Sequence, residues 1–138
     1  MAKIKFPHFT LEEAKVLEEF QKRFPYFTNW RYDVKLKSRK LDLAKIDDPI
    51  LKKMWYHLTA KRIDAVCEDN ENIYIIEVKR YMMASGIGQL LVYQYMFNEQ
   101  FKPKKNIKLW LISYYPDPDV EHIANQLGIR TWSVKSIE

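Results

Sequence analysis

The chain has 138 residues, of which 47% are hydrophobic and 30% are charged. This composition is typical of a globular protein and excludes an intrinsically disordered chain. No apolar run approaches the ~20 residues of a membrane helix, and no apolar signal core follows the charged first residues. We therefore expect one domain over residues 1–138, located in the cytoplasm. The net charge of +5 is compatible with a polyanionic partner but does not identify one.

Cysteine and histidine chemistry is not indicated. Cys67 is the only cysteine, which excludes an intramolecular disulfide and a cysteine-based zinc site. The three histidines are far apart and lack the spacing of metal ligands: His8, His57 and His122. A Ser-His-Asp or Cys-His arrangement has no local signature either.

The first predicted element is a helix that begins near Thr10. The segment Thr10-Leu11-Glu12-Glu13 has the pattern of a capping box, and Pro25 lacks the backbone donor that a longer helix would need. Apolar residues recur between these limits at helical spacing: Leu11, Ala14, Leu17, Phe20 and Phe24. At ~100° per residue, Glu13 falls within this inward-facing stripe, whereas Glu12 points away from it.

A half-buried strand and a short helix follow. Apolar Trp30, Tyr32, Val34 and Leu36 alternate with charged residues, as in a strand with one buried face. Asp48 followed by Pro49 is typical of a helix start. The apolar stripe of that helix is expected to be Ile50, Leu51, Met54, Trp55 and Leu58.

The remaining chain alternates strands and helices. Residues 62–68 and 73–79 are predicted strands joined by the turn-rich tetrapeptide 69–72. The later elements are expected to be a helix over 87–97, a strand over 106–115, a helix from Asp117-Pro118 to Gly128, and a strand over 129–134. The order α-β-(α)-β-β-α-β-α-β predicts an α/β fold, with a mixed sheet flanked by helices.

Two charged residues interrupt the apolar second strand of the predicted hairpin. Glu77 and Lys79 share one face of that strand, where charges are costly unless they are paired or bind a metal. If the turn pairs Glu68 with Ile73, Asp64 lies directly opposite Glu77. Two facing carboxylates repel each other, and a bound Mg²⁺, which prefers oxygen ligands, would reverse the sign of that interaction.

The alternative is that these are ordinary exposed charges. The strand argues against this alternative because Tyr74, Ile75 and Ile76 make both of its faces apolar. Gln89 and Tyr93 are four residues apart and share one helix face, from which they can hydrogen-bond to the site, although a purely structural role for them stays open. Glu13 likewise has two open roles, as the capping-box partner or as a further acid of the site.

Such a site can perform hydrolysis. A bound divalent ion lowers the pKa of a bound water and stabilises charge on phosphate oxygens. Lys79 can orient that water or neutralise developing negative charge.

Together these residues resemble the PD-(D/E)xK nuclease superfamily. The resemblance lies in Asp64, then Glu77-Val78-Lys79, then Gln89-x-x-x-Tyr93. The last motif is characteristic of the RecB-type branch, and the string around it is also similar to archaeal endonuclease and Holliday-junction resolvase domains. Ile63 stands where the motif has proline. The resemblance implies a restriction-endonuclease-like fold and a Mg²⁺- or Mn²⁺-dependent deoxyribonuclease in DNA repair or recombination.

The resemblance also implies a role for each residue. Asp64 and Glu77 become metal ligands, Lys79 the catalytic lysine, Gln89 and Tyr93 the supporting helix motif, and Glu13 the candidate first-helix acid and third ligand. Plausible DNA-phosphate contacts are Lys35, Lys37, Arg39, Lys40 and Arg80.

Three functions remain open at this point. The first is a metal-dependent DNA nuclease, and the second is a junction resolvase of the same fold that acts as a homodimer. The third is a nucleic-acid-binding module that retains the fold without the chemistry. The sequence leaves open exonuclease or endonuclease action, and a preference for single-stranded, duplex or branched DNA.

Overall fold

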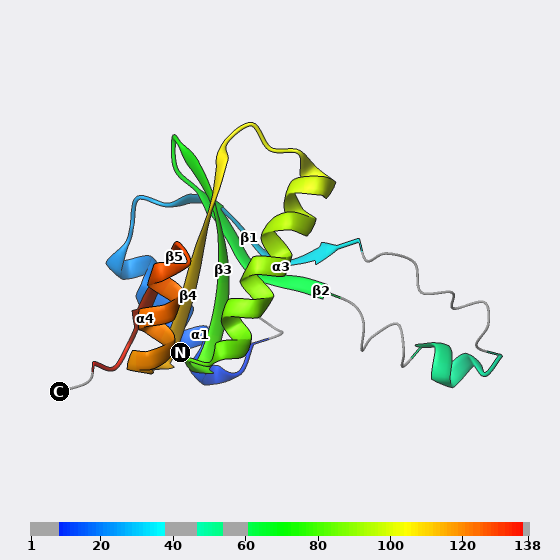
Figure 1. Ribbon diagram of the computed structural model, residues 1–138, viewed down its shortest axis with the longest axis horizontal. Coiled ribbons are helices and arrows are strands. Elements are labelled where there is room, and N and C mark those ends of the chain that lie inside the picture. Colours follow the sequence, from blue (N-terminus) through cyan, green and yellow to red (C-terminus); the bar gives the residue numbers. More distant parts are fainter. Residues whose placement is uncertain (1–8, 38–46, 54–60, 137–138) are drawn as a thin grey trace.

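The computed structural model describes residues 9–37, 47–53 and 61–136. The elements in chain order are α1 (Leu11–Arg23), β1 (Thr28–Leu36), β2 (Lys61–Glu68), β3 (Asn72–Tyr81), α3 (Ala84–Phe101), β4 (Asn106–Tyr115), α4 (Pro118–Gln126) and β5 (Ile129–Ser133) (Figure 1). A short helix over residues 49–53 lies between β1 and β2. The predicted element order is confirmed. Seven residues named above lie outside the described ones: His8, Arg39, Lys40, Met54, Trp55, His57 and Leu58.

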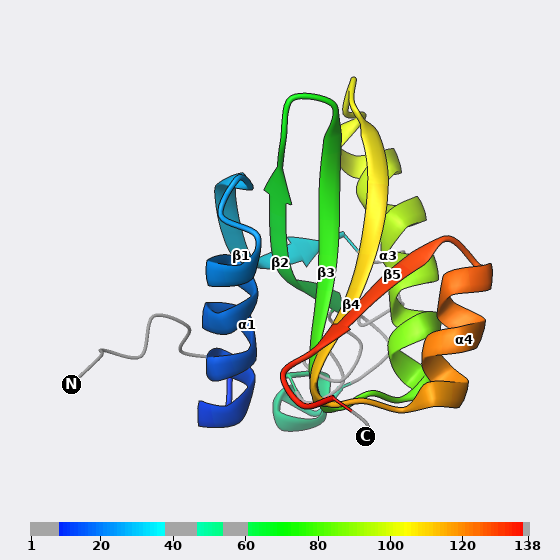
Figure 2. The ribbon, with the colours of Figure 1, turned by 90° about the vertical axis from the view of Figure 1, so that its left-hand side faces the viewer.

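The strands form one mixed sheet in the order β1-β2-β3-β4-β5. β1, β2 and β3 pair antiparallel, whereas β4 pairs parallel to both β3 and β5. Helix α1 covers one face, and α3 and α4 cover the other (Figure 2). This is the α/β architecture expected from the sequence. No helix in the described part of the chain is long and apolar enough to span a membrane.

Each face of the sheet has its own hydrophobic core. Under α1, the buried ring of Phe20 lies within 6.3 Å, centroid to centroid, of five other aromatic rings. These belong to Phe24, Phe27, Trp30, Trp110 and Trp132. Under α3 and α4 the core is mostly aliphatic, with Ile75, Leu90 and Leu111 fully buried. Odd-numbered residues of β3 therefore face α3, and even-numbered ones face α1.

Helix α1 has the predicted capping box but a shifted buried face. The Thr10 amide donates to Glu13 Oε1 at 3.0 Å, and the Glu13 amide donates to Thr10 Oγ1 at 3.1 Å. The prediction that Leu11 is buried is wrong, since its side chain is 73% exposed, and Val16 is buried in addition to the predicted stripe. The reason is position: Leu11 is the first residue of the helix and lies beside the last residues of β4, where little of the sheet remains to cover it.

Strand β1 does not follow the simple alternation expected for it. Asn29 and Asp33 both have a φ of 56°, a left-handed conformation that Asn and Asp adopt more readily than other non-glycine residues. The register with β2 also shifts between Thr28 and Arg31. These irregularities rotate the strand, so that Tyr32 is 37% exposed although alternation predicts it to be inward-facing. Such bulges are common on edge strands.

Candidate active site

Strands β2 and β3 separate where the predicted acids lie. Their pairing runs from Glu68↔Ile73, as the turn length predicted, to Ala65↔Ile76. Residues 61–63 of β2 pair only with β1, and Figure 1 shows the start of β2 directed away from β3. Past the last pair, Asp64 Oδ2 accepts a hydrogen bond from the Val78 amide at 2.8 Å. The carboxylate thus replaces a backbone acceptor that the departing strand no longer supplies.

The place just past Ala65↔Ile76, where β2 and β3 part, is called the fork below. Glu77 is the most deeply buried acid at the fork, with 4% of its surface exposed. Its carboxyl group is within hydrogen-bonding reach of that of Asp64, yet its Oε2 is buried and receives no hydrogen bond from any described donor. Burial first, and then the hydrogen bond and charge of Asp64, raise the pKa of Glu77. Burial also raises the pKa of Asp64. Two carboxylates held this close in a buried place cannot both ionise without cost.

Lys79 and Glu13 act on this pair through their charges. Burial and hydrogen bonding have the largest effects on the pKa values of the two acids. Among the smaller effects, the Lys79 charge lowers the pKa of both acids and the Glu13 charge raises it. Lys79 is half-buried on the same strand face as Glu77. Glu13 Oε1 serves the α1 capping box, so that proposed role is confirmed. In the described residues, no three His, Cys, Asp or Glu side chains gather closely enough to hold a metal ion. Glu13 as a metal ligand stays a prediction.

Helix α3 presents its Gln-x-x-x-Tyr motif to the same place. Gln89 Nε2 donates to the Tyr93 hydroxyl at 3.5 Å, and Gln89 Oε1 is buried and has no donor among the residues that the structure describes. Burial, followed by the charge of Glu77, raises the pKa of Tyr93, which places this ring near the acid pair. The helix begins at Ala84 rather than at 87. Its first turn packs closely, because a Cβ on Gly86 would lie 2.6 Å from Leu111 Cδ1.

The described basic residues predicted to contact DNA lie on β3, on β1, or directly after β1. Arg80, next to Lys79, is exposed, and its Nε lies 2.7 Å from Glu12 Oε2. Lys35 and Lys37, near the end of β1, have exposed side chains. The Gln100 amide holds their backbone, accepting from the Lys37 N–H at 2.8 Å and donating to the Lys35 carbonyl at 3.3 Å.

The Arg80–Glu12 contact was missed by sequence reasoning. Glu12 lies outside the apolar stripe of α1, so helical periodicity predicts that it points away from that stripe. Arg80 follows the catalytic candidate Lys79 directly, but 68 residues separate it from Glu12, and no local pattern joins them.

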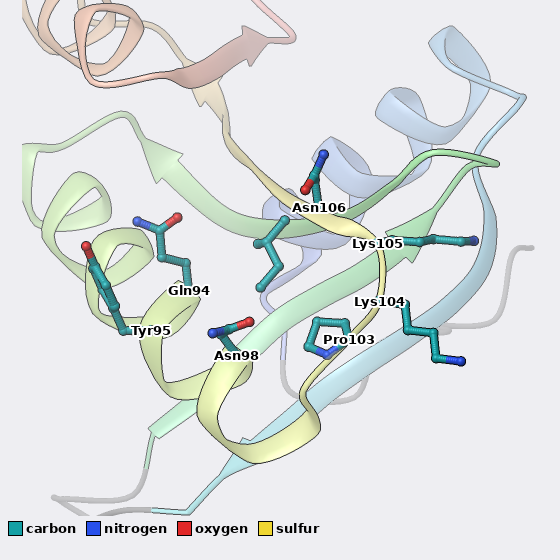
Figure 3. A pocket seen from close by; sticks show the side chains of 8 residues that line it. Gln94, Tyr95, Asn98, Pro103, Lys104, Lys105 and Asn106 are labelled. Carbon is teal, nitrogen blue, oxygen red and sulfur yellow. The ribbon is translucent and has the colours of Figure 1, made fainter.

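A cavity at the opposite end of the sheet contains none of the predicted site residues. It has a volume of about 350 Å³ and lies between α3 and the start of β4 (Figure 3). The residues that line it are Gln94, Tyr95, Asn98, Pro103, Lys104, Lys105, Asn106 and Ile107. Lys105 extends away from it, and its Nζ lies 3.0 Å from Glu68 Oε1 and 2.9 Å from the Asp69 carbonyl. This cavity is separate from the fork.

No protein-family model matches this chain, and no curated protein matches its sequence. Solved structures do resemble its fold. A protein of unknown function, AF1548, is 14% identical with a TM-score of 0.54, covering 94% of this chain and 61% of that one. A repair endonuclease from Pyrococcus abyssi is 14% identical with a TM-score of 0.52, covering 91% and 47%. EndoMS in its apo form is 14% identical with a TM-score of 0.51, covering 94% and 49%.

These likenesses concern the fold. At 14% identity they show that the five-stranded sheet and its helices are arranged as in those structures. The chain spans 61% of the first structure and about half of the other two.

Proposed function

We propose that this protein is a DNA nuclease that hydrolyses phosphodiester bonds with Mg²⁺ or Mn²⁺ as its cofactor. The observation that carries the proposal is Glu77, a carboxylate 4% exposed beside Asp64, with an oxygen that no described donor reaches. A buried pair of like charges is unfavourable by itself, and a divalent cation supplies the positive charge that the pair lacks. The choice of DNA is supported by the fold's likeness to a repair endonuclease.

The donor atoms of the fork fit such an ion. Mg²⁺ prefers oxygen ligands and is commonly held by one or two carboxylates, with waters and substrate phosphates completing its shell. Asp64 and Glu77 are two such carboxylates, and a third protein ligand is not required. When bound, the ion would lower the pKa of a coordinated water and offset charge on the phosphate.

The other side chains of the fork have distinct tasks. Lys79 shares the strand face of Glu77, so its ammonium can neutralise negative charge that develops on the phosphate. Gln89 Oε1, which has no donor in the described protein, can accept a hydrogen bond from the attacking water and orient it. Arg80, held by Glu12 at 2.7 Å, can contact a neighbouring phosphate.

Two other functions remain as alternatives. A junction resolvase would need a symmetric homodimer, and dimerisation stays a prediction that sedimentation at micromolar concentration tests. A binding module without chemistry would have no use for two buried, facing carboxylates. Calorimetry that shows DNA affinity without Mn²⁺ binding would favour the binding module.

Cleavage of end-labelled DNA tests the proposal. Single-stranded, duplex and branched substrates are incubated with Mg²⁺, Mn²⁺ or EDTA, and cleavage is expected only with a metal. Glu77→Gln, which keeps the size of the side chain, Glu77→Ala and Lys79→Ala should each abolish it, whereas Glu71→Ala, on the exposed hairpin turn, should not. Cleavage in EDTA, or full activity of the Glu77 and Lys79 variants, would overturn the proposal.

A further inference from the structure

Three tyrosines gather at the ends of the two central strands. Tyr81 ends β3, Tyr114 and Tyr115 end β4, and Tyr81 is the register partner of Tyr115. The rings of Tyr81 and Tyr115 stack, with centroids 5.1 Å apart and planes inclined by 16°. Tyr114 meets Tyr115 edge-on at 4.9 Å. These three residues are called the tyrosine edge below.

The tyrosine edge exposes aromatic surface on a rigid support. Tyr81 is 50% exposed and Tyr115 is 38% exposed, although a stacked ring pair gains most when it is removed from water. Both rings stand on paired strands, and the Met82 amide extends the pairing by donating to the Tyr115 carbonyl at 3.0 Å. Contiguous exposed apolar surface of this kind is a common mark of a binding site.

The tyrosine edge adjoins the candidate active site. Strand alternation places Glu77, Lys79 and Tyr81 one after another along the same face of β3. Tyr81 therefore lies two side-chain repeats beyond Glu77, about 13 Å along the strand at ~3.3 Å per residue. A DNA strand whose phosphate lies at the acid pair can reach the tyrosine edge with a nearby nucleotide.

Three cations lie near the rings of the tyrosine edge, and one of them, Arg80, is paired with Glu12. The Arg80 guanidinium lies 5.1 Å from the Tyr81 ring centroid, and the ammonium groups of Lys15 and Lys135 each lie 5.9 Å from that of Tyr114. Exposed aromatic rings among cations are the combination that binds single-stranded nucleic acid, where bases stack and phosphates are neutralised. An apolar protein surface would instead have to desolvate these charges.

A cavity beside the tyrosine edge offers room for a base. It has a volume of about 290 Å³ and is lined by Leu11, Glu12, Lys15, Tyr114 and Tyr115. Leu11, which departs from the predicted buried stripe with 73% exposure, forms an apolar wall. Lys15 supplies a charge that can reach a phosphate.

We propose that the tyrosine edge and this cavity bind an unpaired base of a DNA strand adjacent to the bond that is cleaved. The inference rests on the proposed nuclease function and specifies its substrate class, which is DNA with a single-stranded segment next to the scissile phosphate. Fully paired DNA keeps its bases stacked inside the duplex and cannot use the tyrosine edge.

Binding in EDTA tests the inference without cleavage. A single-stranded oligonucleotide with one 2-aminopurine reports affinity by anisotropy and stacking by fluorescence quenching. Tyr115→Leu and the double variant Tyr81→Leu/Tyr115→Leu should bind it about tenfold or more weakly and lose the quenching, because stacking on an aromatic side chain contributes strongly to single-strand binding. Affinity for a blunt duplex should change little.

Two variants serve as controls. Tyr115→Phe keeps the ring and should bind like the wild type, which separates stacking from the hydroxyl group. Tyr95→Leu removes a tyrosine that is 70% exposed on α3, outside the tyrosine edge, and should also bind normally. Thermal unfolding of every variant verifies that the fold is retained.

The outcomes separate this inference from the nuclease proposal. If the leucine variants bind and quench like the wild type, or if the wild type binds no single-stranded DNA, the inference is overturned even where the wild type cleaves DNA. If the leucine variants lose single-strand binding while the wild type never cleaves with Mn²⁺, base binding is supported and the nuclease proposal fails.

Discussion

The two ends of the β2–β3 hairpin carry acids in opposite circumstances. At the turn, the Lys105 ammonium lies 3.0 Å from Glu68 Oε1, and the Tyr74 hydroxyl donates to Asp69 Oδ2 at 2.6 Å. The hydrogen bond from Lys105 lowers the pKa of Glu68, and that from Tyr74 lowers the pKa of Asp69. Glu68 and Asp69 each have a side-chain donor within the fold, so their ionised carboxylates are the favoured forms.

At the fork, in contrast, the ionised forms of the two carboxyl groups are disfavoured. Burial raises the pKa of both Asp64 and Glu77, and Glu77 Oε2 receives no hydrogen bond from the described residues. Glu68 and Asp69 belong to the same hairpin as Asp64 and Glu77, so strand geometry alone does not explain why their pKa values shift in opposite directions. The difference is that Glu68 and Asp69 have side-chain donors, whereas Glu77 Oε2 has none among the described residues. Under the proposed function, a divalent cation would meet that oxygen. Unsatisfied buried acids of this kind are typical of functional sites.

The largest expected contrast is in DNA cleavage. Asp64→Asn keeps an oxygen that can accept from the Val78 amide and removes only the charge, so it should lower the cleavage rate by about 10²–10³-fold or more. Glu68→Gln makes the same kind of change at the turn and should leave the rate unaltered. Single-turnover cleavage with Mn²⁺ measures both. Equal rates for the two variants would remove the functional distinction between the ends.

A smaller effect on cleavage is expected from helix α3. Gln89→Ala should lower the rate by about 10–100-fold, the usual effect of removing a residue that orients a group at a metal site. Gln94→Ala changes the same side chain on the same helix, but at the cavity of Figure 3, and serves as the matched control. If Gln94→Ala loses as much activity as Gln89→Ala, the effect comes from the helix and not from the site.

The free energy of unfolding without metal should show how much the buried Glu77 carboxylate destabilises the fold. The folded-state pKa of Glu77 lies above its unfolded value, so the free energy of unfolding falls as pH rises from ~4.3 toward the folded value. Glu77→Gln should flatten this decline and stabilise the metal-free protein by roughly 1–3 kcal/mol at pH 8. Urea denaturation in EDTA at pH 5 and pH 8 measures both effects. A variant that is less stable than the wild type at pH 8 would show that the carboxylate is satisfied in the folded protein.

The smallest effect is expected at the turn. Lys105→Met removes a partly exposed ion pair and should cost no more than about 1 kcal/mol. The pKa of Glu68 is lowered, so this contribution is present above the unfolded carboxyl pKa and disappears as pH falls through the folded value. Urea denaturation at pH 7 and pH 3 measures the loss, with the exposed Lys104→Met as control. A loss of stability in Lys105→Met that is larger at pH 3 than at pH 7 would contradict a stabilising ion pair between Lys105 and Glu68.

The sequence by itself determined the hairpin and the order of its chemical groups. A four-residue turn sets the antiparallel register from Glu68↔Ile73 to Ala65↔Ile76. This register brings Asp64 toward Glu77 just past the point where the two strands part. Strand alternation then places Lys79 beside Glu77, and helical periodicity joins Gln89 to Tyr93. All of these relations are local, and local periodicity depends only on backbone geometry.

Only the tertiary structure decided which elements meet and where burial ends. The pairing of Glu12 with Arg80, the stacking of Tyr81 on Tyr115 and the exposure of Leu11 each depend on residues far apart in the chain. The left-handed residues Asn29 and Asp33 rotate β1 out of its expected alternation. Periodicity tells which face of its own element a side chain takes, but long-range packing decides what covers that face. The acid pair was therefore predictable, whereas the tyrosine edge beside it was not.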